Sequence, residues 1–257
     1  MEKEKWAYIS ILATEDYLDG VKVLYKSLRR FTDKEFLLLV NEEISETVVQ
    51  ALSELGMRVI RVVDIKIQPG VLSEKMQGDR WRHTLYKLRV FGMTEYDTLV
   101  YLDSDMLVCG NLDDLFLKKS MSAVSDKTFF PEYGRAGINA GVFTFRPSKE
   151  LEQNLIELIP ETATKMEVFG DQDVLNMYFV AWETETDRHL DIKYNACFYQ
   201  LDAYHQVIPL VVHFILGSKP WMWSKSQILK NMKWLLQGKR KQRQYFKEYL
   251  SLLKSVR

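Results

Sequence analysis

The sequence predicts an α/β fold in which one mostly parallel central sheet carries helices on both faces. Strand-like and helix-like segments alternate along the chain, which is the pattern of parallel βαβ units. The 257 residues are 47% hydrophobic, enough for one large and well-filled core. No internal repeat, low-complexity stretch or Pro/Gly-rich linker interrupts the alternation. A single folded domain is therefore the simpler account.

The first five segments follow the order strand, helix, strand, helix, strand. Apolar runs at 6–14, 35–40 and 57–63 predict the three strands. Between them, apolar residues recur at helical spacing at 15–31 and 45–56, so these stretches predict helices. Strands joined by such crossovers lie parallel in one sheet.

The later segments continue the same two patterns. A helix at 83–93 leads into a strand at 97–108, and residues 225–257 predict one or two terminal helices broken near Gly238. The other predicted elements are strands at 138–147 and 211–216 and a helix at 170–182.

Charge is distributed unevenly, although the formal net charge is zero. Residues 230–257 hold nine Lys or Arg and one acidic residue, a local charge of +8 that leaves −8 on residues 1–229. We therefore divide the chain into a folded body, 1–229, and a basic helical C-terminal segment, 230–257. The acidic body argues against nucleic acid as a partner, because binding to phosphates needs a positive surface.

The start of the chain, MEKEKWAYIS, is charged before it is apolar and lacks the order of a secretory signal. No apolar run reaches the length of a membrane span, so we expect a cytoplasmic protein. The two cysteines, Cys109 and Cys197, fit neither a metal-site spacing nor a disulfide framework. Both are expected to be buried thiols.

Two aspartates, Asp103 and Asp105, interrupt the apolar strand at 97–108 near its carboxyl end. In open parallel sheets, ligands bind beyond the carboxyl ends of the strands. If the segment stays extended, carboxylates at i and i+2 share one face, and a divalent cation would relieve their repulsion. The triplet alone is weak support, because most such triplets are turns or helix caps.

A histidine and a lysine follow near the next strand end. His213 alone would be a core side chain satisfied by a backbone carbonyl. With the two aspartates it instead completes a mixed oxygen and nitrogen site, which suits Mn²⁺ better than a thiolate-binding metal. Lys219 lies just past Gly217 and could neutralise a phosphate.

Four motifs, LDSDMLV, NAGVFTFRPS, GDQDVLN and VVHFILGSKPW, resemble glycosyltransferase family 8 in order and spacing, and among its members the glycogenins. The resemblance runs from about Trp6 to Trp223. It implies a single-domain GT-A type, Rossmann-like nucleotide-sugar fold that transfers glucose or galactose from UDP-glucose or UDP-galactose with retention of configuration. It also implies a Mn²⁺ cofactor, with Mg²⁺ as the alternative, held by Asp103, Asp105 and His213.

The resemblance assigns catalysis to Asp171, Gln172 and Lys219. Asp171 is the carboxylate expected near the anomeric carbon, and the sequence leaves a nucleophilic and a front-face route open. Lys87 matches a second family lysine, although alone it would be a solvated helix residue. The residues expected to bind metal and UDP-sugar are Ile11, Ala13, Thr14, Tyr17, Lys87, Asp103, Ser104, Asp105, Asp126, Asn139, Ala140, Gly141, Asp171, Gln172, His213, Gly217 and Lys219.

Four of these residues have structural alternatives. Tyr17 has the spacing of a core helix residue, which competes with stacking on uracil. Asp171 could cap a helix, Asn139 could lie in a turn, and Asp126 could lie in a surface loop.

Two positions depart from the glycogenin pattern and leave the acceptor open. Val168 stands where the resemblance places an acidic residue, and Ala140 stands where it places a serine. The acceptor is the chain itself, another protein, a glycan or a lipid-linked sugar. For self-glucosylation the corresponding region holds Tyr194, Tyr199 and Tyr204.

The C-terminal segment bears on whether the acceptor is linked to a lipid at a membrane. Tyr245, Tyr249, Leu252 and Val256 share one helical face among basic residues, which is typical of a helix on an anionic membrane surface. The same face could instead pack on the acidic body. Three alternatives therefore stay open. The protein could contact the inner membrane surface peripherally, it could form a homodimer, and it could bind nucleotide-sugars without catalysing transfer.

Overall fold

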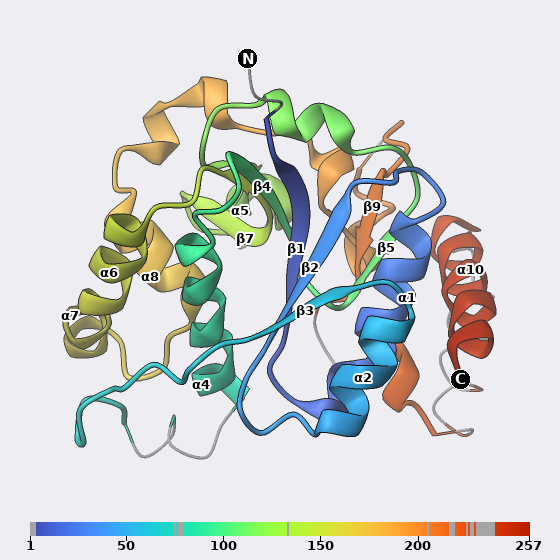
Figure 1. Ribbon diagram of the computed structural model, residues 1–257. Helices are drawn as coiled ribbons and strands as arrows, with labels where there is room; N and C mark the ends of the chain where they lie inside the picture. Colours follow the sequence, from blue (N-terminus) through green and yellow to red (C-terminus); the bar gives the residue numbers. More distant parts are fainter. Residues whose placement is uncertain are drawn as a thin grey trace.

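A six-stranded sheet forms the centre of the computed structural model (Figure 1). The structure describes residues 4–73, 76, 80–132, 134–204, 206–215, 219–224, 226, 229 and 240–257. The strands lie in the order β3-β2-β1-β4-β7-β6. Their bounds are β1 Trp6–Leu12, β2 Glu35–Val40, β3 Arg58–Arg61, β4 Thr98–Leu102, β6 Ser122–Ser125 and β7 Ile138–Phe145.

The sheet is mostly parallel, as predicted. Strands β3, β2, β1 and β4 run parallel, and β7 runs antiparallel to both β4 and β6. Alternate residues of β1 enter different cores: Tyr8 packs on one face of the sheet, whereas Ala7 and Ile9 pack on the other. This alternation explains the nearly continuous apolar run, because a strand covered on both faces has no solvent side.

Helices cover both faces (Figure 1). Helices α1, α2 and α10 lie on one side, and α4, α6, α7 and α8 lie on the other. The helices are α1 Leu18–Leu28, α2 Glu46–Glu54, α4 Arg80–Thr84, α5 Asp126–Phe129, α6 Lys149–Glu157, α7 Ile159–Lys165, α8 Asp171–Tyr178 and α10 Arg240–Val256.

Several predicted elements differ from the observed ones. The strand expected at 97–108 splits, because β4 ends at Leu102 and the chain turns before it enters a second, three-stranded sheet. The helix expected at 83–93 is the end of α4 followed by a 3₁₀ helix, η2 Leu85–Gly92. The second sheet, ordered β5-β9-β8, was not predicted; its strands are β5 Met106–Val108, β8 Ala196–Cys197 and β9 Val211–His213.

The C-terminal helix α10 packs on the body of the protein beside α1. Tyr245 and Tyr249 are buried, and Leu252 and Val256 are partly buried against the core, so the apolar face considered for a membrane surface packs on protein. The predicted break near Gly238 lies outside the described residues. Among the helices that the structure describes, none has the length and apolar character needed to cross a bilayer.

Candidate active site

The site begins at the turn between β4 and β5, where the two aspartates lie. The prediction that this segment stays extended was wrong: Ser104 and Asp105 form a turn. Two backbone hydrogen bonds hold it, because the N–H of Asp103 donates to the Gly141 carbonyl (3.0 Å) and the Asp105 carbonyl accepts from the N–H of Phe214 (2.9 Å). The turn thereby joins the central sheet to the second sheet at the carboxyl end of β4.

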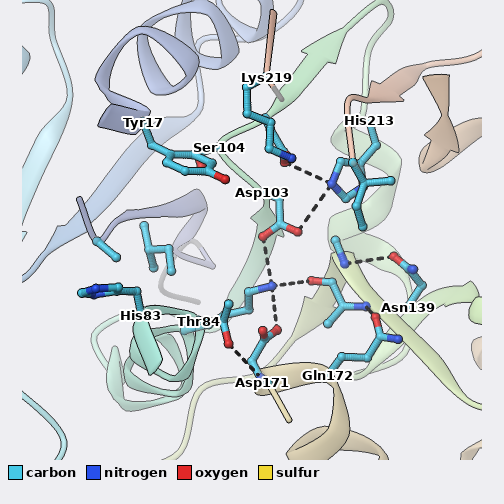
Figure 2. Close-up of a pocket in the computed structure, with 18 of the residues that line it drawn as sticks. Tyr17, His83, Thr84, Asp103, Ser104, Asn139, Asp171, Gln172, His213 and Lys219 are labelled. Carbon is cyan, nitrogen blue, oxygen red and sulfur yellow. Dashed lines mark hydrogen bonds and ion pairs between the residues drawn. The ribbon is translucent and has the colours of Figure 1, made fainter. Parts of the chain in front are cut away.

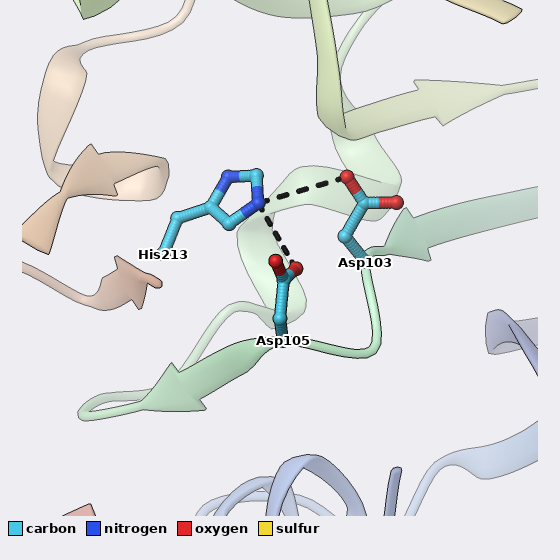
Figure 3. Close-up of side chains that lie close together, drawn as sticks. All are labelled: Asp103, Asp105 and His213. Atoms are coloured by element: carbon cyan, nitrogen blue, oxygen red, sulfur yellow. Dashed lines mark ion pairs between the residues drawn. The ribbon is translucent and has the colours of Figure 1, made fainter. Parts of the chain in front are cut away.

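Asp103, Asp105 and His213 converge at this turn (Figure 3). His213 Nε2 lies 3.0 Å from Asp105 Oδ1 and 3.7 Å from Asp103 Oδ2. One ligand atom from each of the three residues lies within 4.8 Å of the others. The triad predicted from sequence is therefore confirmed as a spatial cluster, although its carboxylates meet through a turn instead of along a strand.

A chain of side-chain hydrogen bonds fixes the orientation of His213. Its Nδ1 lies 3.0 Å from Asn195 Oδ1, Asn195 Nδ2 donates to Asn139 Oδ1 (2.7 Å), and Asn139 Nδ2 donates to Asp126 Oδ1 (2.9 Å). Since Asn195 presents its oxygen to the ring, Nδ1 carries a proton, and Nε2 faces the two carboxylates.

This orientation makes the triad a fitting cation site. Nε2 lies 3.0 Å from a carboxylate oxygen of Asp105, and either a proton on Nε2 or a cation bound by both groups offsets the negative charge there. Two carboxylates and one imidazole are ligands for Mn²⁺ or Mg²⁺ rather than for a thiolate-binding metal.

Two buried lysines neutralise the same carboxylates. Lys87 Nζ lies 2.9 Å from Asp103 Oδ1 and 2.7 Å from Asp171 Oδ2, and it donates to the Ala140 carbonyl (3.0 Å). Lys219 Nζ lies 2.6 Å from Asp105 Oδ2. Lys87 is 5% exposed and Lys219 is 7% exposed, so the reading of Lys87 as a solvated helix lysine is wrong.

These pairs set the charges of the site. Burial alone would lower the pKa of Lys87, but Asp103 and Asp171 outweigh it and raise this pKa, so the ammonium stays charged. Burial opposes the charge of Asp105, yet Lys219 and His213 hold its pKa well below the ordinary value. Burial raises the pKa of Asp171 despite the nearby Lys87. The pKa values of Asp105 and Asp171 are therefore shifted in opposite directions.

The cluster lines a cavity of ≈ 930 Å³, and Figure 2 shows Asp103 among the other lining residues. Every predicted donor or metal residue that the structure describes lines this cavity, whereas Gly217 lies outside the described residues. Sequence reasoning missed further lining residues: Asp16, His83, Thr84, Phe130, Gly170, Asp173, Ile215 and Met222. Asp16, His83, Thr84 and Asp173 lie within predicted helices, but only the fold shows that they face the cavity.

The structure excludes three of the structural alternatives. Asn139 lies within β7 and not in a turn. Asp126 is 8% exposed and bonded to Asn139, so it is not a surface loop residue. Asp171 is the first residue of α8 and pairs with Lys87 instead of capping the helix. Tyr17 lines the cavity and also packs edge-on against Trp221, with ring centroids 5.4 Å apart.

An open α/β sheet with a carboxylate–histidine cluster beyond the end of β4 defines the class of GT-A type glycosyltransferases. Residues 8–225 match the family model described as glycosyl transferase family 8. The chain belongs to glycosyltransferase family 8.

Known proteins with similar sequences and structures fall in the same class. Mouse glycogenin-1 is 30% identical over 223 residues, which cover 84% of this chain and 65% of that protein. A UDP-glucuronate:xylan alpha-glucuronosyltransferase of Arabidopsis thaliana is 28% identical over 84% of this chain and 35% of its own length. The crystal structure of galactosyltransferase LgtC with donor and acceptor sugar analogs shares the fold, with a TM-score of 0.65, 19% identity and coverage of 96% and 95% of the two chains.

Proposed function

We propose that this protein transfers glucose or galactose from a UDP-sugar to an acceptor with retention of configuration, and that it uses Mn²⁺. The observation that carries this proposal is the convergence of Asp103, Asp105 and His213 within 4.8 Å in the lining of a cavity of ≈ 930 Å³. Family membership and the similarity to glycogenin-1 support the donor class.

Asp103, Asp105 and His213 would hold the metal, which when bound supplies a Lewis acid for the diphosphate leaving group. The protein's own contribution is preorganised positive charge. Lys219 approaches from the segment after β9, is 7% exposed, and lines the same cavity. In such a water-poor setting a fixed ammonium stabilises the charge that develops on UDP as the glycosidic bond breaks.

Asp171 and Gln172 are proposed to face the donor sugar from the start of α8. Gln172 Oε1 accepts from the N–H of Ala140 (3.0 Å), which fixes the amide against β7. Asp171 is held by Lys87 and by the hydroxyl of Thr84, which accepts from its N–H (3.3 Å). A carboxylate held in this way can act as a nucleophile or can orient the sugar for a front-face attack, and we propose no choice between these routes.

The acceptor is proposed to be a molecule other than Tyr194 or Tyr204 of the same copy. Both side chains are 5% exposed. The Tyr204 hydroxyl donates to the Phe129 carbonyl (2.6 Å), and the Tyr194 hydroxyl donates to Asp114. A hydroxyl engaged in this way is a poor glycosyl acceptor. A glycan or lipid-linked acceptor, a cytoplasmic location and a homodimer stay predictions.

The function is tested by incubating the protein with Mn²⁺ and UDP-glucose, then UDP-galactose, while following UDP release and intact mass. We expect UDP release that EDTA stops and that Asp105→Asn reduces at least about 100-fold, because the variant loses a metal ligand charge. Asp33→Asn, at an exposed position, is the matched control and should behave like the wild type.

Mass increments of whole hexoses would identify the protein itself as acceptor. UDP release without added mass would place the acceptor elsewhere. No release with either donor, despite UDP binding, would instead favour the silent nucleotide-sugar binding protein.

A further inference from the structure

His83 lines the proposed donor cavity but belongs to none of the groups discussed so far. Within the described part of the chain its imidazole makes no hydrogen bond, and Nδ1 is buried without a partner. Buried polar atoms are nearly always bonded in native proteins, so an unsatisfied nitrogen beside a cavity calls for a specific explanation. Nδ1 itself has almost no accessible surface, so a ligand in the cavity would bond Nε2 of the ring, or Nδ1 after the ring turns about its Cβ–Cγ bond.

The ring of Tyr86 packs against the imidazole of His83 and fixes the orientation of its plane. The two rings are stacked, with centroids 6.4 Å apart and an interplanar angle of 10°. Burial, followed by a hydrogen bond to Asp64, raises the pKa of Tyr86 to about 12, so this support is a neutral phenol with an anchored hydroxyl. His83 is therefore presented to the cavity on a fixed platform.

A chain of contacts connects this platform to the end of β1. Tyr86 interacts with Asn41 as well as with Asp64. Asn41 Nδ2 in turn donates to the carbonyl of Ala13 (2.8 Å). Ala13 lines the same cavity as His83 and as Tyr17, the residue considered above for stacking on uracil, so these contacts connect His83 with the side of the cavity where we expect the nucleoside.

The contact made by Thr84, the next residue on α4, indicates that His83 does not face the donor sugar. Successive residues of a helix point about 100° apart. Thr84 points toward Asp171, whose N–H it accepts, and His83 points away from that contact (Figure 2). In the same view, His83 and Tyr17 lie on the side of Asp103 opposite to Asn139.

We propose that His83 binds the pyrimidine base of the donor through a hydrogen bond to its polar edge. Uracil offers both a donor, N3–H, and acceptors, O2 and O4, so either neutral tautomer of His83 finds a partner. This inference rests on the proposed function, because it assumes that a uridine nucleotide occupies the cavity.

The experiment measures binding of UMP, UDP and inorganic pyrophosphate, each with Mn²⁺, by titration calorimetry. His83→Phe keeps the ring stacked on Tyr86 and removes both nitrogens, whereas His83→Gln restores a hydrogen-bonding group. We expect His83→Phe to weaken UMP and UDP about five- to tenfold, the range for one lost hydrogen bond, and to leave pyrophosphate binding unchanged. His83→Gln should recover part of the loss, and the KM for the UDP-sugar should rise without a matching fall in kcat.

Other results would overturn the assignment. Equal weakening of pyrophosphate would place the effect at the metal end, and unchanged UMP binding would remove His83 from the nucleoside. A change confined to the KM for the acceptor would move His83 to the acceptor side. If the wild-type protein bound pyrophosphate but neither UMP nor UDP, the proposed function would fail together with the role of His83.

Discussion

At the residue scale, the site is assembled from groups that would each be unstable alone. Asp105 is buried with both carboxylate oxygens engaged, Oδ1 beside His213 and Oδ2 beside Lys219. A buried charge is tolerated only when it is paired and hydrogen-bonded. Lys219 therefore neutralises Asp105. A divalent metal that binds Asp105 must either share the carboxylate with the Lys219 ammonium or displace it.

This competition leads to a prediction about Lys219→Met. Without nucleotide, the variant should bind Mn²⁺ about tenfold more tightly than the wild type, because a nearby positive charge is removed. With UDP present, its affinity for the nucleotide should fall, because the phosphates lose a cation. Counting free Mn²⁺ by electron paramagnetic resonance, with and without UDP, measures both effects.

The matched control is Lys165→Met, because Lys165 pairs with Glu161 on the exposed side of α7. Its Mn²⁺ affinity should equal that of the wild type. Weaker Mn²⁺ binding by Lys219→Met would mean that Lys219 organises the carboxylate for the metal instead of competing with it.

At the scale of elements, α10 stabilises the segment that carries Lys219. Tyr249 of α10 is fully buried, and its ring lies 4.7 Å from that of Phe214 and 6.2 Å from that of Trp221. Trp221 Nε1 donates to the Asp16 carbonyl (2.7 Å), and Arg257 donates to the Trp221 carbonyl (2.9 Å). The C-terminal helix and the 3₁₀ helix η1 Glu15–Tyr17 thus both contact Trp221, two residues after Lys219.

We predict that Tyr249→Ala lowers the free energy of unfolding by about 3–5 kcal/mol, the usual cost of removing a large buried aromatic side chain. Tyr249→Phe is the control. The hydroxyl of Tyr249 is buried and has no partner among the described residues, so removing it should leave the free energy of unfolding unchanged or slightly higher. Urea denaturation measures both.

The same variants decide between the two roles considered for the C-terminal segment. If Tyr249→Ala cost less than about 1 kcal/mol and removal of residues 239–257 abolished binding to anionic vesicles, the membrane-surface helix would be correct. Loss of stability with unchanged vesicle binding would leave only the packing role.

The elements also show what the sequence can and cannot predict. The βαβαβ start follows from periodicity, because each segment repeats one pattern over many residues. The turn at Ser104 could not be predicted, since 97–108 is apolar on both sides of it and its two halves pair in different sheets. Nor does local pattern reveal the antiparallel direction of β7, which depends on where the chain returns.

At the scale of the whole molecule, the site joins parts that are otherwise separate. Asp103 follows the central sheet, His213 ends a strand of the second sheet, and Asp171 starts α8. The candidate residues were predictable because four motifs occur together, whereas His83 and Asp16 carry no pattern of their own. Their place in the site depends on contacts between segments far apart in the sequence.

A site that bridges these parts should stabilise the whole fold when it is filled. A ligand at 100 times its dissociation constant adds about 2.7 kcal/mol, and for a chain of this size each kcal/mol raises Tm by roughly 2–4 °C. We expect UDP with Mn²⁺ to raise Tm by about 5–10 °C at that saturation, and UDP with EDTA to raise it much less. Differential scanning calorimetry tests this, with Asp105→Asn expected to lose the metal-dependent part. An equal rise with UDP and EDTA would mean that the nucleotide binds without a metal, and the triad would then be a structural ion-pair cluster.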